Sequence, residues 1–454
     1  ALRGVWAQAA FWASASADAA APAELVAVSN ATQVVQADVG AADASSGGVE
    51  WAAYYWWPLI FYMFYVMSVV CDDYLVPTVD AICDYFRIPE DVAGATLVAF
   101  ACNGPELLTN VCGIFVTKTS VGMGTVVGSA IFNVLVITGA CPMVSPLGKL
   151  RVCKRRFLRD VLFSAISIVM LWWALPVVDL FKASALFGMS AVYALVVAKS
   201  DAWLGPAGQE TSALENALLD SGASSESEGC KPETCKPIVG APFEGDKPLA
   251  GAPFAGDGAG QEAPGFAAAR LVSALSDIAS RPIDFVLALT VPDLKAYNVS
   301  VPRMLVAFFS SMAWLSGTAY VVCLGSDAIN RHWGVPQAFL GLTLVAVGTS
   351  WPNLMASVVT ARAGRGAIAV SNALGSNVQN VFLVLAGPIW VSVLLNGDYV
   401  ADGADILASV LWMGITLAFV AAAVAFEGFR LTSMAGWSFM VLYAAYLVQA
   451  TLLA

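Results

Sequence analysis

The stretch VAFACNGPELLTNVCG, residues 98–113, places a glutamate, Glu106, inside a run that is otherwise apolar enough to cross a membrane. A Gly-Pro pair stands directly before it, and proline breaks helices because it lacks a backbone N–H. The run returns 247 residues later as VAVGTSWPNLMASVVT. This shift superposes Pro105 on Pro352 and Glu106 on Asn353. The two stretches are therefore copies of one broken helix.

The composition indicates a membrane protein. Hydrophobic residues make up 59% of the 454 residues and charged residues only 12%, whereas soluble domains carry about 25% charged residues. Apolar runs long enough to cross a hydrocarbon layer of ~30 Å recur ten times, at 52–71, 92–117, 121–144, 158–178, 182–198, 304–325, 338–361, 366–395, 405–426 and 431–454. The sequence predicts an all-α polytopic membrane protein with ten transmembrane helices.

The internal shift of 247 residues extends beyond the broken helix. It superposes the run GSAIFN at 128–133 on GSNVQN at 375–380, and it aligns the starts of all five spans in each half. Because each half has an odd number of spans, the second copy must enter the membrane in the opposite orientation. We therefore predict two inverted five-helix repeats, 51–200 and 282–454, with the substrate site between them near the midplane of the bilayer.

The remaining segments are polar. Residues 201–281 are rich in Gly, Pro, Ser and acidic residues, a composition typical of disorder. The most basic loop, SPLGKLRVCKRRFLRD, follows the third span, and Lys and Arg in short loops mark the cytoplasmic side. This orientation places Arg362 and Arg430 inside, makes 201–281 a disordered acidic cytoplasmic linker, and makes 1–50 an extracytoplasmic N-terminal segment.

The broken helices suggest a cation site. A charge at the centre of a membrane helix costs at least ~2.5 kcal/mol and marks a functional site by default. We expect Glu106 to be the only acidic residue deep inside a span. Proline cannot donate to the carbonyl four residues back. Pro105 should therefore free the carbonyl of Ala101, and Pro352 that of Gly348.

Further oxygen-bearing side chains surround the two breaks. Carboxylate, amide, hydroxyl and carbonyl oxygens suit hard cations such as Na⁺, K⁺ and Ca²⁺. Amides and hydroxyls in membrane helices can instead bond to neighbouring helices. Because the set recurs in both copies together with the prolines, we favour a cation site. Its candidate side chains, besides Glu106, are Asn103, Ser129, Asn133, Thr349, Ser350, Asn353, Ser376 and Asn380.

At these residues the chain resembles the cation/calcium exchanger superfamily, most closely its potassium-dependent sodium/calcium exchangers. The resemblance covers roughly 54–200 and 282–396. It implies ten spans, alternating access by sliding of one helix pair against the other, and Na⁺ entry that drives Ca²⁺ out with K⁺ cotransported. The matching runs are VCDDYLVP, DVAGATLVAF, PELLT, VGMGTVVGSAIFNVL, LTVPD, GLTLVAVGTS and AVSNALGSNV.

The resemblance also assigns roles and shows departures. Glu106 matches the first-repeat glutamate that binds Ca²⁺ and Na⁺ in alternation. Asn353 and Asn380 stand where the family has aspartates, the second of them linked to K⁺ dependence, and Asn103 replaces a usual serine. One carboxylate thus remains of three. Since Ca²⁺ affinity rises with ligand charge, we expect weakened Ca²⁺ binding and altered K⁺ coupling.

Two functions fit these observations. The first is a secondary active cation antiporter of the sodium/calcium exchanger type with altered selectivity. The alternative is a transport-inactive membrane homologue that acts as a regulatory or binding partner. The prolines, hydroxyls and glycines that remain around the replaced charges favour the antiporter.

We expect no enzyme. We expect the one histidine, His332, in an outer loop, and no nucleotide-binding glycine loop next to a strand is found. The expected partners are cations and the lipid bilayer, without cofactor or nucleic acid. The plasma membrane is the expected location, with an organelle membrane as the alternative. The sequence carries no signal for an oligomeric state.

Overall fold

The computed structural model describes most of both predicted repeats. The predicted N-terminal segment 1–50 and residues 205–280 of the predicted linker lie outside the described residues. The described ranges are 54–87, 99–145, 148–204, 281–292, 300–362, 366–401 and 404–453.

The described chain is nearly all helical, as predicted. Within these residues eight helices are long and apolar enough to cross a membrane, and a ninth span is formed by the pair Gln337–Thr349 and Trp351–Arg362, which is bent by 42°. The tenth predicted span, 92–117, is described only from Ala99 onward. The polytopic helical fold is confirmed, and the described residues show up to nine complete spans and part of the tenth.

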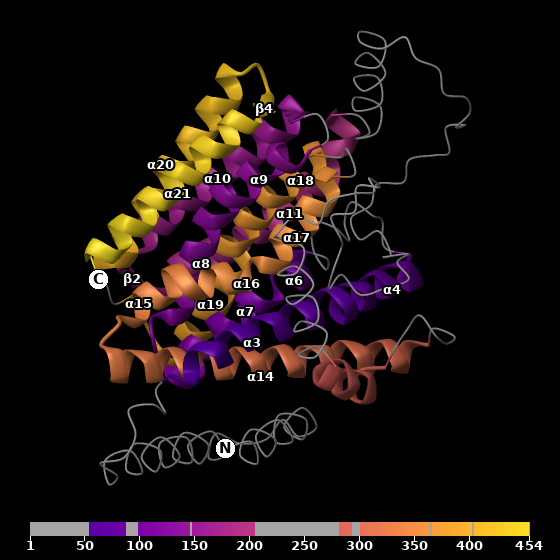
Figure 1. Ribbon diagram of the computed structural model, residues 1–454, viewed down its shortest axis with the longest axis vertical. Coiled ribbons are helices and arrows are strands. Elements are labelled where there is room, and N and C mark those ends of the chain that lie inside the picture. The colour runs from indigo at the N-terminus through magenta and orange to yellow at the C-terminus, as the bar shows by residue number, and fades with distance from the viewer. Residues whose placement is uncertain are drawn as a thin grey trace, which may run out of the picture.

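The helices follow the two repeats (Figure 1). The first half contains α3 (Trp56–Val69), η2 (Val70–Leu75), α4 (Val76–Phe86), α6 (Ala99–Cys102), α7 (Gly104–Val111), η4 (Cys112–Thr117), α8 (Val121–Phe132), η5 (Asn133–Ile137), α9 (Thr138–Val144), α10 (Lys154–Ala174) and α11 (Leu180–Leu204). The second half contains α14 (Val301–Trp333), α15 (Gln337–Leu340), η6 (Gly341–Val345), α16 (Ala346–Thr349), α17 (Trp351–Arg362), α18 (Gly366–Gln379), η7 (Asn380–Leu385), α19 (Ala386–Asn396), α20 (Ala404–Phe426) and α21 (Ser433–Leu453).

Segments of π-helix interrupt several of these helices. The first span is longer than the predicted 52–71, because a π-helical turn, η2, carries the helix through Asp72 and Asp73 to Phe86. Two further π-helical segments, η5 and η7, begin at Asn133 and Asn380. These asparagines are equivalent under the internal shift. Because π turns occur frequently at functional sites, the symmetric pair points to this depth of the bundle.

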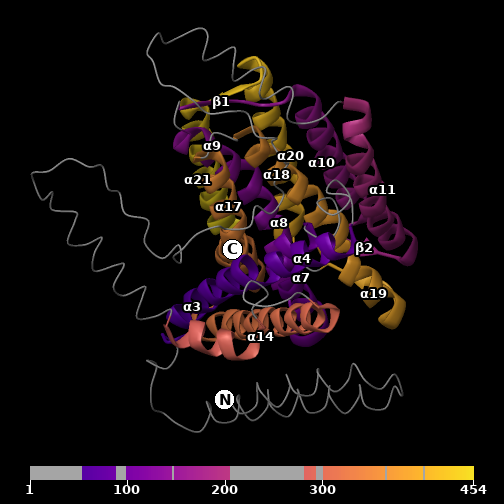
Figure 2. The same ribbon diagram turned by 90° about the vertical axis from the view of Figure 1, so that its right-hand side faces the viewer.

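The first long helices of the two halves form a separate layer. Helices α3 and α14 lie side by side along one side of the molecule and run across the direction of the remaining bundle (Figures 1 and 2). They share a hydrophobic cluster that includes Ile60 and Met67 from α3 and Leu315 and Val322 from α14. This layer is therefore packed on the remaining bundle as a unit with helices from both halves.

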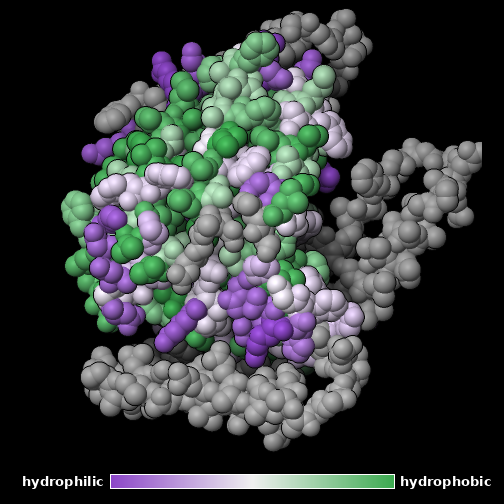
Figure 3. All heavy atoms as spheres, turned by 90° about the vertical axis from the view of Figure 1, so that its left-hand side faces the viewer, coloured by the Kyte–Doolittle hydropathy of each residue, from purple (hydrophilic) through white to green (hydrophobic). Residues whose placement is uncertain are grey.

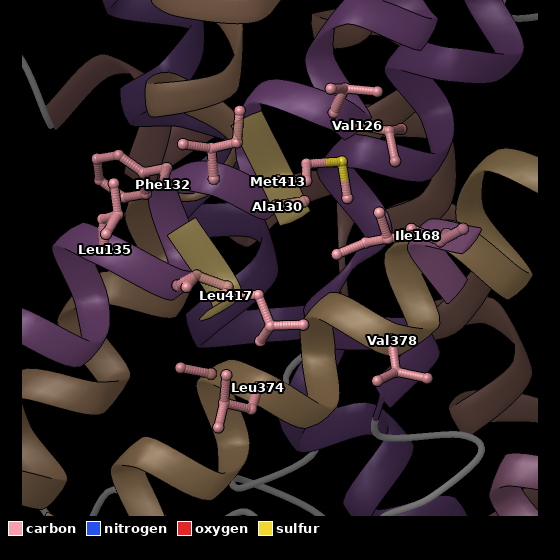
Figure 4. Close-up of a cluster of buried hydrophobic side chains, with 14 of the residues drawn as sticks. Val126, Ala130, Phe132, Leu135, Ile168, Leu374, Val378, Met413 and Leu417 are labelled. Atoms are coloured by element: carbon pink, nitrogen blue, oxygen red, sulfur yellow. The ribbon is translucent and has the colours of Figure 1, made fainter. Parts of the chain in front are cut away.

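The rest of the helices pack around a second hydrophobic cluster. Close to its centre, Phe132 of α8 and Leu135 of η5 lie near Leu374 of α18 and Leu417 of α20 (Figure 4). Both halves therefore contribute to one core. In a bilayer such contacts stabilise the bundle through close packing rather than through the exclusion of water.

The outer face is apolar. Hydrophobic residues cover much of the face shown in Figure 3. Large side chains stand nearly free on the last two helices, such as Phe426, Met434 and Leu452, which are 95%, 83% and 81% exposed. A surface of this kind fits contact with lipid chains.

Two short antiparallel sheets tie the halves together. Strand β1 (Lys149–Arg151) pairs with β4 (Arg430–Thr432), and β2 (Val177–Val178) pairs with β3 (Tyr399–Val400). The two sheets lie at opposite ends of the bundle (Figures 1 and 2). Shifted by 247 residues, β1 falls next to β3 and β2 falls close to β4. The two sheets are therefore related by the internal repeat. The first sheet also brings the basic loop and Arg430 to one end, as the predicted orientation requires.

Glycines let the two halves cross closely. A Cβ atom added to Gly128 of α8 would overlap the carbonyl oxygen of Leu342 in η6, and one added to Gly341 would meet that of Val121. These close backbone contacts leave no room for a side chain. They join the first half to the second beside the two broken helices.

We predict that Gly128→Ala prevents normal assembly, because overpacking a tight contact costs ~1–3 kcal/mol or more. The measurement is the yield of monodisperse protein after size-exclusion chromatography. The matched control is Gly188→Ala in α11, where an added Cβ meets nothing within 4 Å. Equal yields from the two variants would show that the α8–η6 crossing is looser than described.

Candidate cation site

Both broken helices open at equivalent residues. Helices α6 and α7 are separated at Asn103, with φ −95° and ψ 13°. Helices α16 and α17 are separated at Ser350, with φ −88° and ψ 0°. The internal shift superposes these two residues. Pro105 and Pro352 follow directly in the first turn of each second piece, so the predicted breaks are found in both halves.

The carboxylate of Glu106 lies at the centre of the polar groups. Its side chain is fully buried in the first turn of α7, where the helix dipole favours a negative charge. Its Oε1 accepts hydrogen bonds from Ser129 Oγ at 3.2 Å and from Ser350 Oγ at 3.1 Å. Its Oε2 has no hydrogen-bond partner among the described residues. Both halves thus contribute hydroxyls to one carboxylate.

Two polar contacts across the repeats are equivalent under the internal shift. The hydroxyls of Ser129 and Ser350 lie 2.6 Å apart, and Ser376 Oγ donates to Asn103 Oδ1 at 2.7 Å. The internal shift exchanges Ser129 with Ser376 and Asn103 with Ser350. One contact links α8 of the first half to the break of the second half, and the other links α18 of the second half to the break of the first.

The predicted amides Asn133 and Asn380 are equivalent under the internal shift, and both are fully buried. Asn380 Nδ2 donates to Ser129 Oγ at 3.2 Å, which connects it to the carboxylate group. In the described part of the chain its Oδ1 has no partner, and neither amide atom of Asn133 has one. A buried polar atom without a partner costs about 1–3 kcal/mol. Unpaired acceptor oxygens beside a carboxylate are the donor set that a hard cation requires.

The remaining predicted residues are used differently. Thr349 donates its hydroxyl to the Val345 carbonyl of its own helix at 3.0 Å. The Ala101 carbonyl, which we expected to be free, accepts the Cys71 thiol at a sulfur–oxygen distance of 3.4 Å. The chain around Gly348 packs so closely that an added Cβ would overlap the Phe64 ring.

Asn353 is 5% exposed, and its Nδ2 finds no partner in the described ranges. It occupies the position equivalent to Glu106 on the second break. That both side chains face one ion remains a prediction.

A further amide near the first break joins the two halves. Asn110 of α7 is fully buried, and its Nδ2 donates to the Val384 carbonyl in η7 at 2.8 Å. The residue four positions after Val384 is Pro388 of α19, which lacks the N–H that would bond this carbonyl in an α-helix. The signal in the sequence was the position of Asn110, about one helical turn after Glu106.

A second buried acidic residue lies near the start of a span, outside the predicted site. Asp160 in α10 is also fully buried. Its neighbour Arg159 forms a salt bridge with it at 2.8 Å, and burial of a carboxylate becomes tolerable when it is paired. The adjacent Arg-Asp pair in the sequence was the available signal.

Comparison with known proteins identifies the family. The model of the family described as "Sodium/calcium exchanger protein" matches residues 56–199 and 303–452. The chain belongs to the sodium/calcium exchanger family. Among relatives of this exchanger, human sodium/potassium/calcium exchanger 5 is 28% identical over 87% of this chain and 81% of its own length. Human sodium/potassium/calcium exchanger 4 is 27% identical over 85% of this chain and 79% of its own length.

A solved structure agrees with this fold. The crystal structure of the H⁺/Ca²⁺ exchanger CAX has a TM-score of 0.50 to this exchanger, at 10% identity, over 95% of this chain and 93% of that one. At that identity the likeness concerns the fold alone. The family match and the spans together identify an integral multi-pass membrane protein, a cation antiporter of the sodium/calcium exchanger type.

Proposed function

We propose that the exchanger carries its cations at Glu106 and the neutral oxygens around it. One observation supports this most directly. The Glu106 carboxylate is fully buried, has one oxygen without a partner among the described residues, and stands among hydroxyls from both halves. The proposed ligands are Glu106, Asn103, Ser129, Asn133, Thr349, Ser350, Asn353, Ser376 and Asn380, with the carbonyls of Ala101 and Gly348 as weaker candidates.

The charge balance favours monovalent ions. Na⁺ beside Glu106 forms a neutral pair, whereas Ca²⁺ leaves one uncompensated positive charge. An unpaired charge costs several kcal/mol in a region of low dielectric constant. We infer that the exchanger moves Ca²⁺ against Na⁺ with low Ca²⁺ affinity and without a requirement for K⁺.

The helix layer supplies a means of alternating access. An added Cβ at Gly104, at the first break, would lie 3.3 Å from a methyl of Leu315 in α14 and 3.4 Å from one of Leu75 in η2. The second break meets Phe64 of α3 at Gly348. Both breaks thus lie under the layer formed by α3 and α14. Sliding of that layer along the bundle would uncover the breaks from one side and then from the other.

The second candidate function is a regulatory or binding partner without transport. The connected hydrogen bonds around Glu106 favour transport, because a site released from selection would have no reason to keep hydroxyls from both halves on its one carboxylate. We place the exchanger in the plasma membrane, with an organelle membrane as the alternative.

We predict that Glu106→Gln abolishes cation-dependent flux in reconstituted vesicles, measured with isotopes of Na⁺ and Ca²⁺. The amide keeps the shape of the side chain but removes the negative charge that offsets the desolvation of the ion. Asp84→Asn, at an exposed carboxylate of α4, is the control and should keep normal flux. Near-normal flux in Glu106→Gln would rule out this site.

We predict that transport does not require K⁺, because Asn380 offers an oxygen but no charge. The measurement is Na⁺-dependent flux in K⁺-free buffer and over a series of K⁺ concentrations. The expected rates agree within about twofold, which corresponds to less than ~0.5 kcal/mol. A steep, saturable increase with K⁺ would contradict the proposal.

We predict that Asn353→Asp strengthens Ca²⁺ binding by about tenfold or more, equivalent to ~1.4 kcal/mol. A second carboxylate several ångströms from a divalent ion contributes a few kcal/mol at an effective dielectric constant of ~20, before its own desolvation is subtracted. Calorimetric titration of the purified variant with Ca²⁺ measures the change. Unchanged affinity in a folded variant would show that residue 353 does not face the ion.

A further inference from the structure

A second buried carboxylate lies outside the candidate cation site. Asp160 of α10 accepts three side-chain hydrogen bonds from three helices. Arg159 Nε donates to Oδ1 at 2.8 Å, Tyr193 OH of α11 donates to Oδ1 at 3.3 Å, and Ser371 Oγ of α18 donates to Oδ2 at 2.8 Å. We name Asp160, Arg159, Tyr193 and Ser371 the Asp160 cluster.

The Asp160 cluster is complete in itself. Both carboxylate oxygens have donors, and the Arg159 guanidinium balances the charge. A buried charge that is paired and fully hydrogen-bonded holds its neighbours in one geometry, and removing one partner is strongly destabilising. This cluster therefore differs from Glu106, which keeps an oxygen without a partner. Its chemistry fits a structural role, holding α10, α11 and α18 together, rather than ion binding.

The cluster exists in one half only. Under the internal shift Ser371 corresponds to Gly124, Asp160 to Leu407 and Tyr193 to Met440. None of these three counterparts can form a charged hydrogen bond. In the first half, α8 instead meets the second half through glycines, since a Cβ on Gly124 would lie 2.8 Å from the Ala338 carbonyl oxygen. Of the two helices that carry proposed ligands, α8 is held by close backbone contacts at glycine and α18 by the hydrogen bond to Asp160.

Helix α18 connects the Asp160 cluster to the candidate site. Asn380 follows Ser371 by nine residues, or about two and a half helical turns, which places the two on opposite sides of the helix. Ser371 bonds to α10, while Ser376 bonds to Asn103 and Asn380 bonds to Ser129. Tyr193 also packs against α18, where a Cβ on Gly375 would lie 3.0 Å from its hydroxyl. One side of α18 is held by the scaffold and the other side carries proposed ligands.

We propose that Asp160 and Ser371 are positioning residues that set cation affinity by holding α18 in register with Glu106. The proposal rests on the function proposed above, because it assumes that Ser376 and Asn380 contribute to the cation site. Disrupting the Asp160 cluster should keep every proposed ligand but let α18 shift. The cation affinity should therefore fall more than the maximal transport rate.

The test compares Ser371→Ala and Asp160→Asn with wild type in reconstituted vesicles. We expect Ser371→Ala to raise the half-saturating Na⁺ concentration about threefold or more, as befits loss of a hydrogen bond to a charged group, with the maximal rate changed less than twofold. Ser371→Thr, which keeps the hydroxyl, should restore the wild-type value. Ser190→Ala is the matched control, because that hydroxyl of α11 donates to the Phe187 carbonyl of its own helix.

Hydrogen exchange supplies a readout that does not depend on transport. Amides of 366–379 should exchange faster in Ser371→Ala and Asp160→Asn, while those of 121–132 in α8 stay unchanged. Unchanged half-saturation together with unchanged exchange in α18 would overturn the proposal, as would reduced thermal stability with unchanged half-saturation. A wild-type protein that neither binds nor transports Na⁺ would overturn the proposed function instead. Faster hydrogen exchange in α18 of the two variants would then still show that the Asp160 cluster holds this helix.

Discussion

The arrangement of both halves depends on one buried carboxylate shared between them. Glu106 receives a hydroxyl from Ser129 of its own half and another from Ser350 of the other half, and those two hydroxyls also contact each other. An ionised group at this depth is tolerable only where such donors converge. The glycine crossings, the paired helix breaks and the bond from Asn380 all bring polar groups to this point.

Much of this could be predicted from the sequence, because the features concerned are local or periodic. Apolar runs give the spans. The prolines give the breaks at Asn103 and Ser350, since a missing N–H acts within one helical turn. The duplication identified Ser129 and Ser376 as equivalent before any contact was known. In the structure the polar contacts of Ser129 and Ser376 are related by the same internal shift.

What could not be predicted depends on which faces of distant helices meet. Asp160 was overlooked because its neutralisation needs Tyr193 and Ser371 from two other helices. The Ala101 carbonyl was expected to be free, yet a thiol from η2 reaches it. Pro388 leaves the Val384 carbonyl without a donor from its own helix, but that Asn110 of the other half reaches this carbonyl depends on how the two helices pack.

The two small sheets have a mechanical consequence. Helix α10 is flanked by β1 and β2, and α20 by β3 and β4. Since β1 pairs with β4 and β2 with β3, the start of each helix is stitched to the end of the other. The two sheets therefore join α10 and α20 at both ends and oppose sliding of one helix along the other. Among the described strands none adjoins α3 or α14, so these two helices lie outside the part of the bundle that the strands join.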